Sequence, residues 1–119
     1  MDKEPVQRLI LVDDEPVILE LLKTIFSDAG YELHCCSDGE SAVRVMESEG
    51  VDVLLTDKNL PGIGGLELVQ RAKQIQPDSE AIVLTGYASL DTALRAMELN
   101  VFDYILKPPK DMNKIEIPL

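Results

Sequence analysis

The sequence predicts an α/β fold in which a doubly wound parallel sheet is covered by helices on both faces. Short apolar runs of strand length alternate along the chain with longer segments whose apolar residues recur at helical spacing. Turn-forming and helix-stopping residues, mainly glycine and proline, separate these segments. Strands that alternate with helices form parallel sheets, because each right-handed crossover places its helix on one face of the sheet.

Each expected element follows from the same pattern. The run 8–12 (RLILV) is nearly continuously apolar, as in a parallel strand that is buried on both faces. The next helix is expected to begin at Pro16, which suits a first helical turn, and to be capped at its end by Gly30. The later segments repeat this alternation. The expected strands are 8–12, 31–36, 51–56, 81–84 and 101–106, and the expected helices are 16–29, 41–49, 66–75 and 90–99.

The end of the chain departs from the pattern. Residues 110–119 (KDMNKIEIPL) contain β-branched residues and a proline, and they show no helical stripe. A last helix is therefore expected to be short, irregular or missing. A chain of 119 residues can bury one core but not two, so we expect a single domain whose core spans about residues 8–109.

Composition excludes several classes of function. The formal net charge of −11 argues against direct binding to a nucleic-acid backbone, which needs lysine and arginine to replace counterions. The first residues lack a basic segment followed by an apolar one, and no apolar run reaches membrane-spanning length, so we expect a cytoplasmic protein without membrane contact. Cys35 and Cys36 are neighbours, and a disulfide between neighbours is strained, so we expect two small buried thiols.

Polar residues follow four of the five expected strands. Asp13 and Asp14 come after the first strand, Asp57 after the third, Thr85 after the fourth and Lys107 after the fifth. The carboxyl ends of parallel strands meet at one edge of the sheet, and ligands bind in the crevice there. We therefore expect three carboxylates, one hydroxyl and one amine to face a single crevice.

This set of side chains favours a magnesium site and phosphoryl transfer. Unit charges ~4 Å apart repel by roughly 4 kcal/mol at an intermediate effective dielectric, so three adjacent carboxylates call for a cation. Mg²⁺ fits because it prefers oxygen ligands, takes one or two carboxylates and keeps positions for water or phosphate. Zn²⁺ is disfavoured, since His34 is the only histidine. A carboxylate beside a metal, a lysine and a hydroxyl is typical of phosphoryl transfer, with Asp57 as the nucleophile.

The residues that follow the strands resemble, in this order, the motifs of the receiver family of bacterial response regulators. Those motifs are an acidic pair, a phosphoacceptor aspartate, a threonine or serine, and Lys-Pro. The resemblance covers roughly residues 9–108. It implies the flavodoxin-like strand order 2-1-3-4-5 and a single receiver domain over residues 1–119. Asp57 would take a phosphoryl group from a sensor histidine kinase or phosphotransfer protein in a Mg²⁺-dependent reaction. The chain would be a phosphorylated signalling domain rather than an enzyme with outside substrates.

The resemblance also implies the ligands of the metal and of the phosphoryl group. Asp14 would bind Mg²⁺ directly together with Asp57, and Asp13 would bind it largely through water. The backbone carbonyl of Asn59 would complete the metal site. Lys107 would hold one phosphoryl oxygen, and Thr85 would hold another.

Thr85 would also begin the conformational switch that follows phosphorylation. It would move toward the new phosphate, and Tyr104, the aromatic residue of the fifth strand, would turn inward behind it. Gly86 is small and would leave the site open to a phosphodonor. Lys58, directly after the phosphoacceptor, would add a positive charge near the metal.

The resemblance extends to the expected partners. The segment 84–108 (LTGYASLDTALRAMELNVFDYILKP) is similar to receivers attached to ATPase-type transcription activators. An output domain or a target protein is therefore expected. The family dimerises through a face that includes its last helix, so the doubtful helix at 110–119 implies a monomer or a weak phosphorylation-dependent dimer.

Each residue also has an ordinary interpretation. Acids such as Asp13 and Asp14 complement a helix dipole, Asp57 could form a simple turn, and the glycines at 62–65 fit turn geometry. Two other functions stay open. One is a Mg²⁺-dependent phosphatase with an aspartyl intermediate, although Asn59 stands where such enzymes need a second aspartate. The other is a pseudo-receiver or flavin-binding module that uses the fold only as a binding surface.

Overall fold

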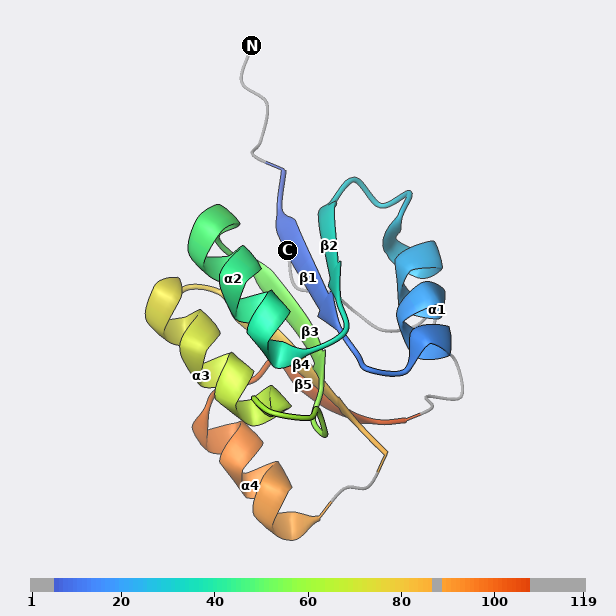
Figure 1. Cartoon of the computed structure of the whole chain (residues 1–119). Helices are drawn as coiled ribbons and strands as arrows, with labels where there is room; N and C mark the ends of the chain where they lie inside the picture. Colours follow the sequence, from blue (N-terminus) through green and yellow to red (C-terminus); the bar gives the residue numbers. More distant parts are fainter. Residues whose placement is uncertain (1–5, 87–88, 108–119) are drawn as a thin grey trace.

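The computed structural model describes residues 6–86 and 89–107 and contains one parallel sheet (Figure 1). Its strand order is β2-β1-β3-β4-β5, which confirms the predicted fold class and order. The strands are β1 (Arg8–Val12), β2 (Glu32–Cys36), β3 (Val53–Asp57), β4 (Glu80–Thr85) and β5 (Asp103–Leu106). The helices are α1 (Pro16–Phe26), α2 (Gly39–Glu49), α3 (Gly65–Ile75) and α4 (Leu90–Glu98).

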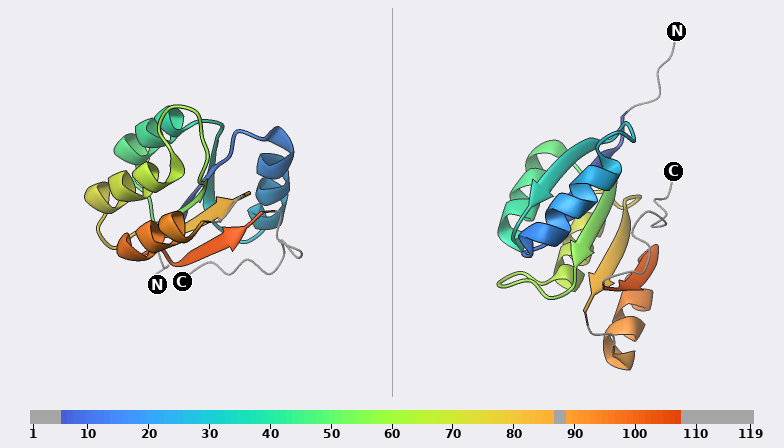
Figure 2. Two further views of the ribbon diagram at one scale, coloured as in Figure 1. Left: turned by 90° about the horizontal axis from the view of Figure 1, so that it is seen from below. Right: turned by 90° about the vertical axis from the view of Figure 1, so that its right-hand side faces the viewer.

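Helices lie on both faces of the sheet, as the two views of Figure 2 show. The position of β1 between two other strands explains why its sequence is almost entirely apolar. Successive side chains of a strand point to opposite faces. Ile10 and Val12 belong to the core shared with α2 and α3, whereas Leu9 and Leu11 belong to the core beneath α1. All four side chains are fully buried, so this inner strand is fixed from both sides.

Several elements begin or end a few residues away from the expected positions, for local reasons. The helix α1 ends at Phe26, three residues early, so Gly30, with φ of 85°, lies in the following turn and is not its cap. The helix α2 begins two residues early because the side chain of Asp38 accepts a hydrogen bond from the backbone N–H of Ser41 at 2.7 Å. The helix therefore starts at Gly39, directly after this cap.

The cysteines differ in their surroundings. Cys36 is buried, but Cys35 is exposed, so the prediction of two buried thiols is wrong for Cys35. Its strand, β2, is at the edge of the sheet, where one side chain of each neighbouring pair can reach solvent. Both thiols are unpaired cysteines rather than a disulfide.

Two further expectations concern the chain as a whole. Among the described residues, no helix has both the length and the apolar character needed to cross a membrane. The expectation of a short, irregular or missing last helix at 110–119 lies outside the described residues.

Candidate functional site

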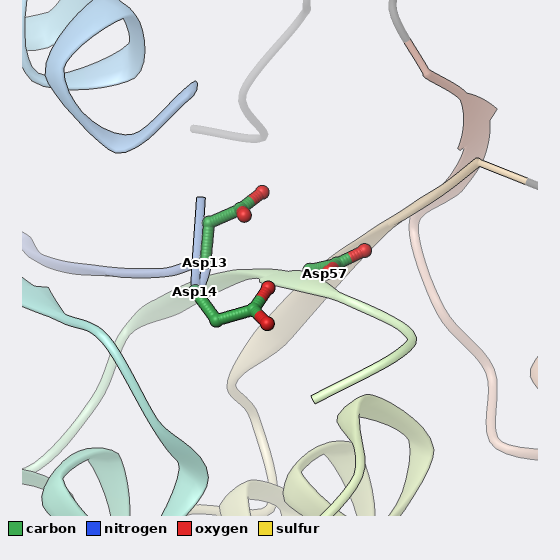
Figure 3. Close-up of side chains that lie close together, drawn as sticks. All are labelled: Asp13, Asp14 and Asp57. Carbon is green, nitrogen blue, oxygen red and sulfur yellow. The ribbon is translucent and has the colours of Figure 1, made fainter. Parts of the chain in front are cut away.

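Three carboxylates gather at the carboxyl ends of β1 and β3 (Figure 3). One oxygen atom from each of Asp13, Asp14 and Asp57 lies within 4.8 Å of the others. Asp13 and Asp57 are buried, whereas Asp14 is exposed. The cluster is therefore open to solvent on the side of Asp14, where a cation could enter.

The backbone fixes the positions of the two buried aspartates. The N–H of Asp13 donates to the carbonyl of Cys36 at 3.1 Å, which continues the pairing of β1 with β2. The Asp13 carboxylate accepts a hydrogen bond from the N–H of Glu15 at 2.8 Å, which turns the chain toward α1. Asp57 is the last residue of β3 and is paired with Leu84 of β4, so it is held in the sheet, one residue beyond the expected end of the strand at 56.

Lys107 brings a positive charge to the cluster from the end of β5. Its ammonium nitrogen lies 2.9 Å from the Asp13 carboxylate, 2.8 Å from that of Glu15 and 3.4 Å from that of Asp57. The Lys107 side chain is only 7% exposed. Burial by itself favours the neutral amine, but the hydrogen bonds to Glu15 and Asp13 and the nearby carboxylate charges together raise the pKa of Lys107. The lysine is therefore held as a cation.

The surroundings of Asp57 act on the pKa of its carboxyl group in both directions. Burial raises its pKa above the ordinary value, and the charge of Asp13 raises it further. Lys107 and the backbone N–H of Asn59 act in the opposite direction and stabilise the carboxylate. A divalent cation at the cluster would relieve the same repulsion.

A cleft of about 460 Å³ opens above these residues. It is lined by Asp14, Glu15, Ile18, Asp57, Asn59, Gly86 and Lys107. Its polar walls thus include two of the three clustered carboxylates, Asp14 and Asp57, together with the lysine. The loop after β3 is closed at its base, because the N–H of Gly65 donates to the carbonyl of Lys58 at 3.0 Å.

The two residues expected to form the switch lie on neighbouring strands. Thr85 is the last residue of β4 and is fully buried at the same edge of the sheet. Tyr104 of β5 is paired with Val83 of β4 and is half-buried. The Tyr104 hydroxyl lies 2.8 Å from that of Thr92 in the first turn of α4. The aromatic ring is therefore tied to α4.

Sequence reasoning missed Glu15 as a contact of Lys107 and Thr92 as the partner of Tyr104. Glu15 directly follows the acidic pair, and this position was the available signal. Thr92 gave no comparable signal, because its contact depends on where α4 lies against β5. His34, by contrast, lies on the edge strand β2 with its ring 3.0 Å from Glu32 and takes no part in the cluster.

Residues 9–116 match the family model of the response regulator receiver domain. The chain belongs to this family. The resemblance seen in the sequence is thereby confirmed, and the protein is a receiver, a signalling domain of two-component systems.

Curated relatives include other receivers and longer regulators. The regulatory protein AtoC of Escherichia coli (strain K12) is 31% identical over 87% of this chain, and the response regulator protein PilR of Pseudomonas aeruginosa is 36% identical over 86%. This chain covers 22% and 23% of those two proteins, about a fifth of their length. The sporulation initiation phosphotransferase F of Bacillus subtilis is 30% identical, and 82% of it is covered.

Solved structures show the same fold. A CheY-like receiver domain protein from Methanospirillum hungatei JF-1 superposes with a TM-score of 0.81 at 32% identity, covering 87% of this receiver and 83% of that chain. A response regulator from Burkholderia pseudomallei, with a phosphorylated aspartic acid, a calcium ion and citrate, has a TM-score of 0.78 at 28% identity, covering 86% and 60%.

Proposed function

We propose that this receiver takes a phosphoryl group onto Asp57 from a sensor histidine kinase or a phosphotransfer protein in a Mg²⁺-dependent reaction. The single observation that carries the proposal is the grouping of Asp13, Asp14 and Asp57 beside the ammonium of Lys107. It supplies a nucleophile, a set of oxygen ligands and a cation within one cleft.

The residues fit a magnesium ion. The donor set consists of carboxylate and carbonyl oxygens, which Mg²⁺ prefers. Asp14 is exposed and would bind the ion directly together with Asp57, whereas Asp13 already contacts Lys107 and would reach the ion largely through water. The backbone carbonyl of Asn59, at the wall of the cleft, would complete the set. When bound, Mg²⁺ would neutralise the carboxylates and the incoming phosphoryl oxygens.

The transfer itself needs little from the protein besides position and charge. A carboxylate oxygen of Asp57 would attack the phosphorus atom and form an acyl phosphate. The bond from phosphorus to the nitrogen of the donor's histidine would break, and that nitrogen would keep the electron pair. Lys107 and the hydroxyl of Thr85 would hold phosphoryl oxygens, and Gly86 would leave the donor room to approach.

The signal would pass through Thr85 and Tyr104. Thr85 would move toward the new phosphate, and Tyr104 would turn inward behind it. The hydrogen bond between Tyr104 and Thr92 supports this role, because an inward turn must break it and so change how β5 holds α4.

We also propose how the domain is used. The sequence of segment 84–108 and the relatives AtoC, PilR and the DNA-binding transcriptional regulator NtrC favour a single receiver over residues 1–119 that serves an output domain or a target protein. The domain would act in the cytoplasm, as a monomer or weak phosphorylation-dependent dimer. With a net charge of −11, contacts with DNA or membranes would have to come from another module.

Phosphorylation with acetyl phosphate tests the proposal. We expect intact-mass spectrometry to show one added phosphoryl group in the presence of Mg²⁺, and no addition with EDTA or in Asp57→Asn. Asp28→Asn, which removes an exposed carboxylate, should label like the unmodified protein. Unchanged labelling of Asp57→Asn would refute the proposal. Continuous turnover of a phosphoester would favour the phosphatase, and a bound yellow chromophore would favour the flavin module.

A further inference from the structure

A side chain outside the cleft reaches the loop that carries Asn59. The carboxylate of Glu40, in the first turn of α2, accepts a hydrogen bond from the backbone N–H of Ile63 at 2.9 Å. The two residues are 23 positions apart in the sequence. In Figure 1 the loop between β3 and α3 passes the beginning of α2, so this contact joins two separate elements.

Two glycines face each other across the contact and let the two backbones approach. A Cβ atom on Gly39 would lie 2.5 Å from the carbonyl oxygen of Ile63. Gly62 has φ of 75°, and a Cβ atom there would lie 2.5 Å from the carboxylate of Glu40. Glycine is therefore required at Gly39 for steric reasons, because the neighbouring atom belongs to the backbone, and at Gly62 by backbone conformation.

The same loop is held at a second point. The N–H of Gly65 donates to the carbonyl of Lys58 at 3.0 Å, and Gly65 packs against the backbone of Asp57. Asn59 therefore directly follows Lys58, whose backbone is held by Gly65. The β3–α3 loop is held again at Ile63 by the bond to Glu40. Leu60 also anchors this loop in the core, and the bond to Glu40 adds a polar anchor at Ile63.

We propose that Glu40 is a positioning residue that holds the β3–α3 loop so that the carbonyl of Asn59 lies where Mg²⁺ needs it. The inference rests on the proposed function, because it assumes that Asn59 is a metal ligand. Mg²⁺ requires near-ideal octahedral geometry at about 2.1 Å, so a loop carbonyl that can drift binds it less well. Groups that orient metal ligands commonly matter for affinity even when they never touch the metal.

Titration with Mg²⁺ by isothermal calorimetry tests the inference. We expect Glu40→Ala to weaken Mg²⁺ binding about fivefold, the size of effect expected from one hydrogen bond. Glu40→Gln keeps an acceptor oxygen and should bind nearly as well as the unmodified protein, although both variants remove the same charge. Glu47→Ala removes an exposed carboxylate from the same helix and should also bind normally.

A second variant approaches the contact from the other side. Gly39→Ala adds a methyl group against the Ile63 carbonyl, while alanine favours the helix itself. It should therefore displace the loop at Ile63 and weaken Mg²⁺ binding, and the circular-dichroism spectrum in EDTA checks that the variant still folds. Hydrogen exchange of the Ile63 amide in EDTA gives a readout without metal, and exchange should be faster in Glu40→Ala than in Glu40→Gln.

The outcomes separate the two proposals. Equal Mg²⁺ affinity in Glu40→Ala and the unmodified protein would overturn the role of Glu40 and leave phosphorylation of Asp57 untouched. Equal weakening by Glu40→Gln, Glu40→Ala and Glu47→Ala would also overturn it, because charge alone would then explain the effect. Conversely, Mg²⁺ binding that depends on Glu40 in a protein that cannot be labelled would refute the proposed function and keep the loop contact.

Discussion

At the scale of single residues, Asp57 has to satisfy two opposing requirements. Under the proposed function it must be ionised to attack phosphorus, whereas burial raises its pKa and favours the protonated form. Lys107 offsets part of this effect from a distance of 3.4 Å. Keeping this buried carboxylate ionised at neutral pH therefore involves some loss of stability, as is common where a site serves function.

The first prediction concerns this loss of stability. A carboxyl group with a raised pKa binds its proton more tightly in the folded than in the unfolded chain, so its ionised form destabilises the fold at neutral pH. We expect Asp57→Asn to be more stable than the unmodified protein at pH 7 in EDTA, by roughly 1 kcal/mol or about 4 °C in melting temperature. The difference should shrink as the pH falls through the pKa of folded Asp57.

Thermal unfolding followed by circular dichroism between pH 4 and pH 8 measures this difference. Asp28→Asn is the matched control, since it removes one carboxylate at an exposed position. A stabilisation that is the same at every pH, or that is shared by Asp28→Asn, would contradict the explanation by burial.

Glu15 supplies the second prediction. Its carboxylate is 61% exposed and shares Lys107 with the buried aspartates. Glu15→Gln removes a negative charge from the mouth of the cleft and loosens the hold on Lys107. We expect labelling by acetyl phosphate, an anionic donor, to become about threefold faster at low salt.

The control is Glu20→Gln, which neutralises an exposed carboxylate farther along α1. The rate of labelling is read by intact mass at several salt concentrations. An equal acceleration in Glu20→Gln would show that net charge, and not the contact with Lys107, sets the rate.

At the scale of elements, the packing of α3 against the end of β3 fixes the position of Asp57. A Cβ atom on Gly65 would lie 2.8 Å from the Cα atom of Lys58 and would collide with the carbonyl oxygen of Asp57. Gly65→Ala must therefore displace α3 or the strand end. We expect a loss of about 2 kcal/mol in the free energy of unfolding by urea, as is usual for overpacking.

Gly86→Ala is the matched control for this variant. A Cβ atom on Gly86 would meet nothing within 4 Å, so its stability should stay near that of the unmodified protein. If both alanine variants lost the same stability, backbone flexibility rather than the collision would be the cause.

The contact between α4 and β5 gives the fourth prediction. Thr92 and Tyr104 share a hydrogen bond at 2.8 Å, and Thr92 also forms a capping box with Ser89. A double-mutant cycle with Thr92→Val and Tyr104→Phe separates the two effects, because the loss of the cap is common to both arms. We expect a coupling of about 1 kcal/mol in unfolding free energy. Additive effects would remove the support that this bond gives to the switch.

At the scale of the whole molecule, much of the fold and site follows from one topological rule. The ends of parallel strands share an edge, so Asp13, Asp57 and Lys107 could be placed together from sequence alone. The exposure of Cys35 could not be predicted from hydrophobic periodicity, because that pattern does not tell which strand lies at the edge. The contact of Glu15 was missed for another reason, since it depends on the conformation of two long side chains.

The last prediction concerns the effect of Mg²⁺ on the stability of the whole domain, which carries a net charge of −11. A ligand that binds only the folded state stabilises it in proportion to the logarithm of its concentration, by about 3 kcal/mol at roughly 100 times its dissociation constant. We expect MgCl₂ to raise the melting temperature in this way, and Asp14→Asn to lose most of the effect because its carboxylate is the exposed member of the cluster. An acidic protein also gains stability from any salt that screens its charges, so NaCl at equal ionic strength is the control. Equal stabilisation by the two salts, or by MgCl₂ in both proteins, would mean that screening and not a bound cation is responsible.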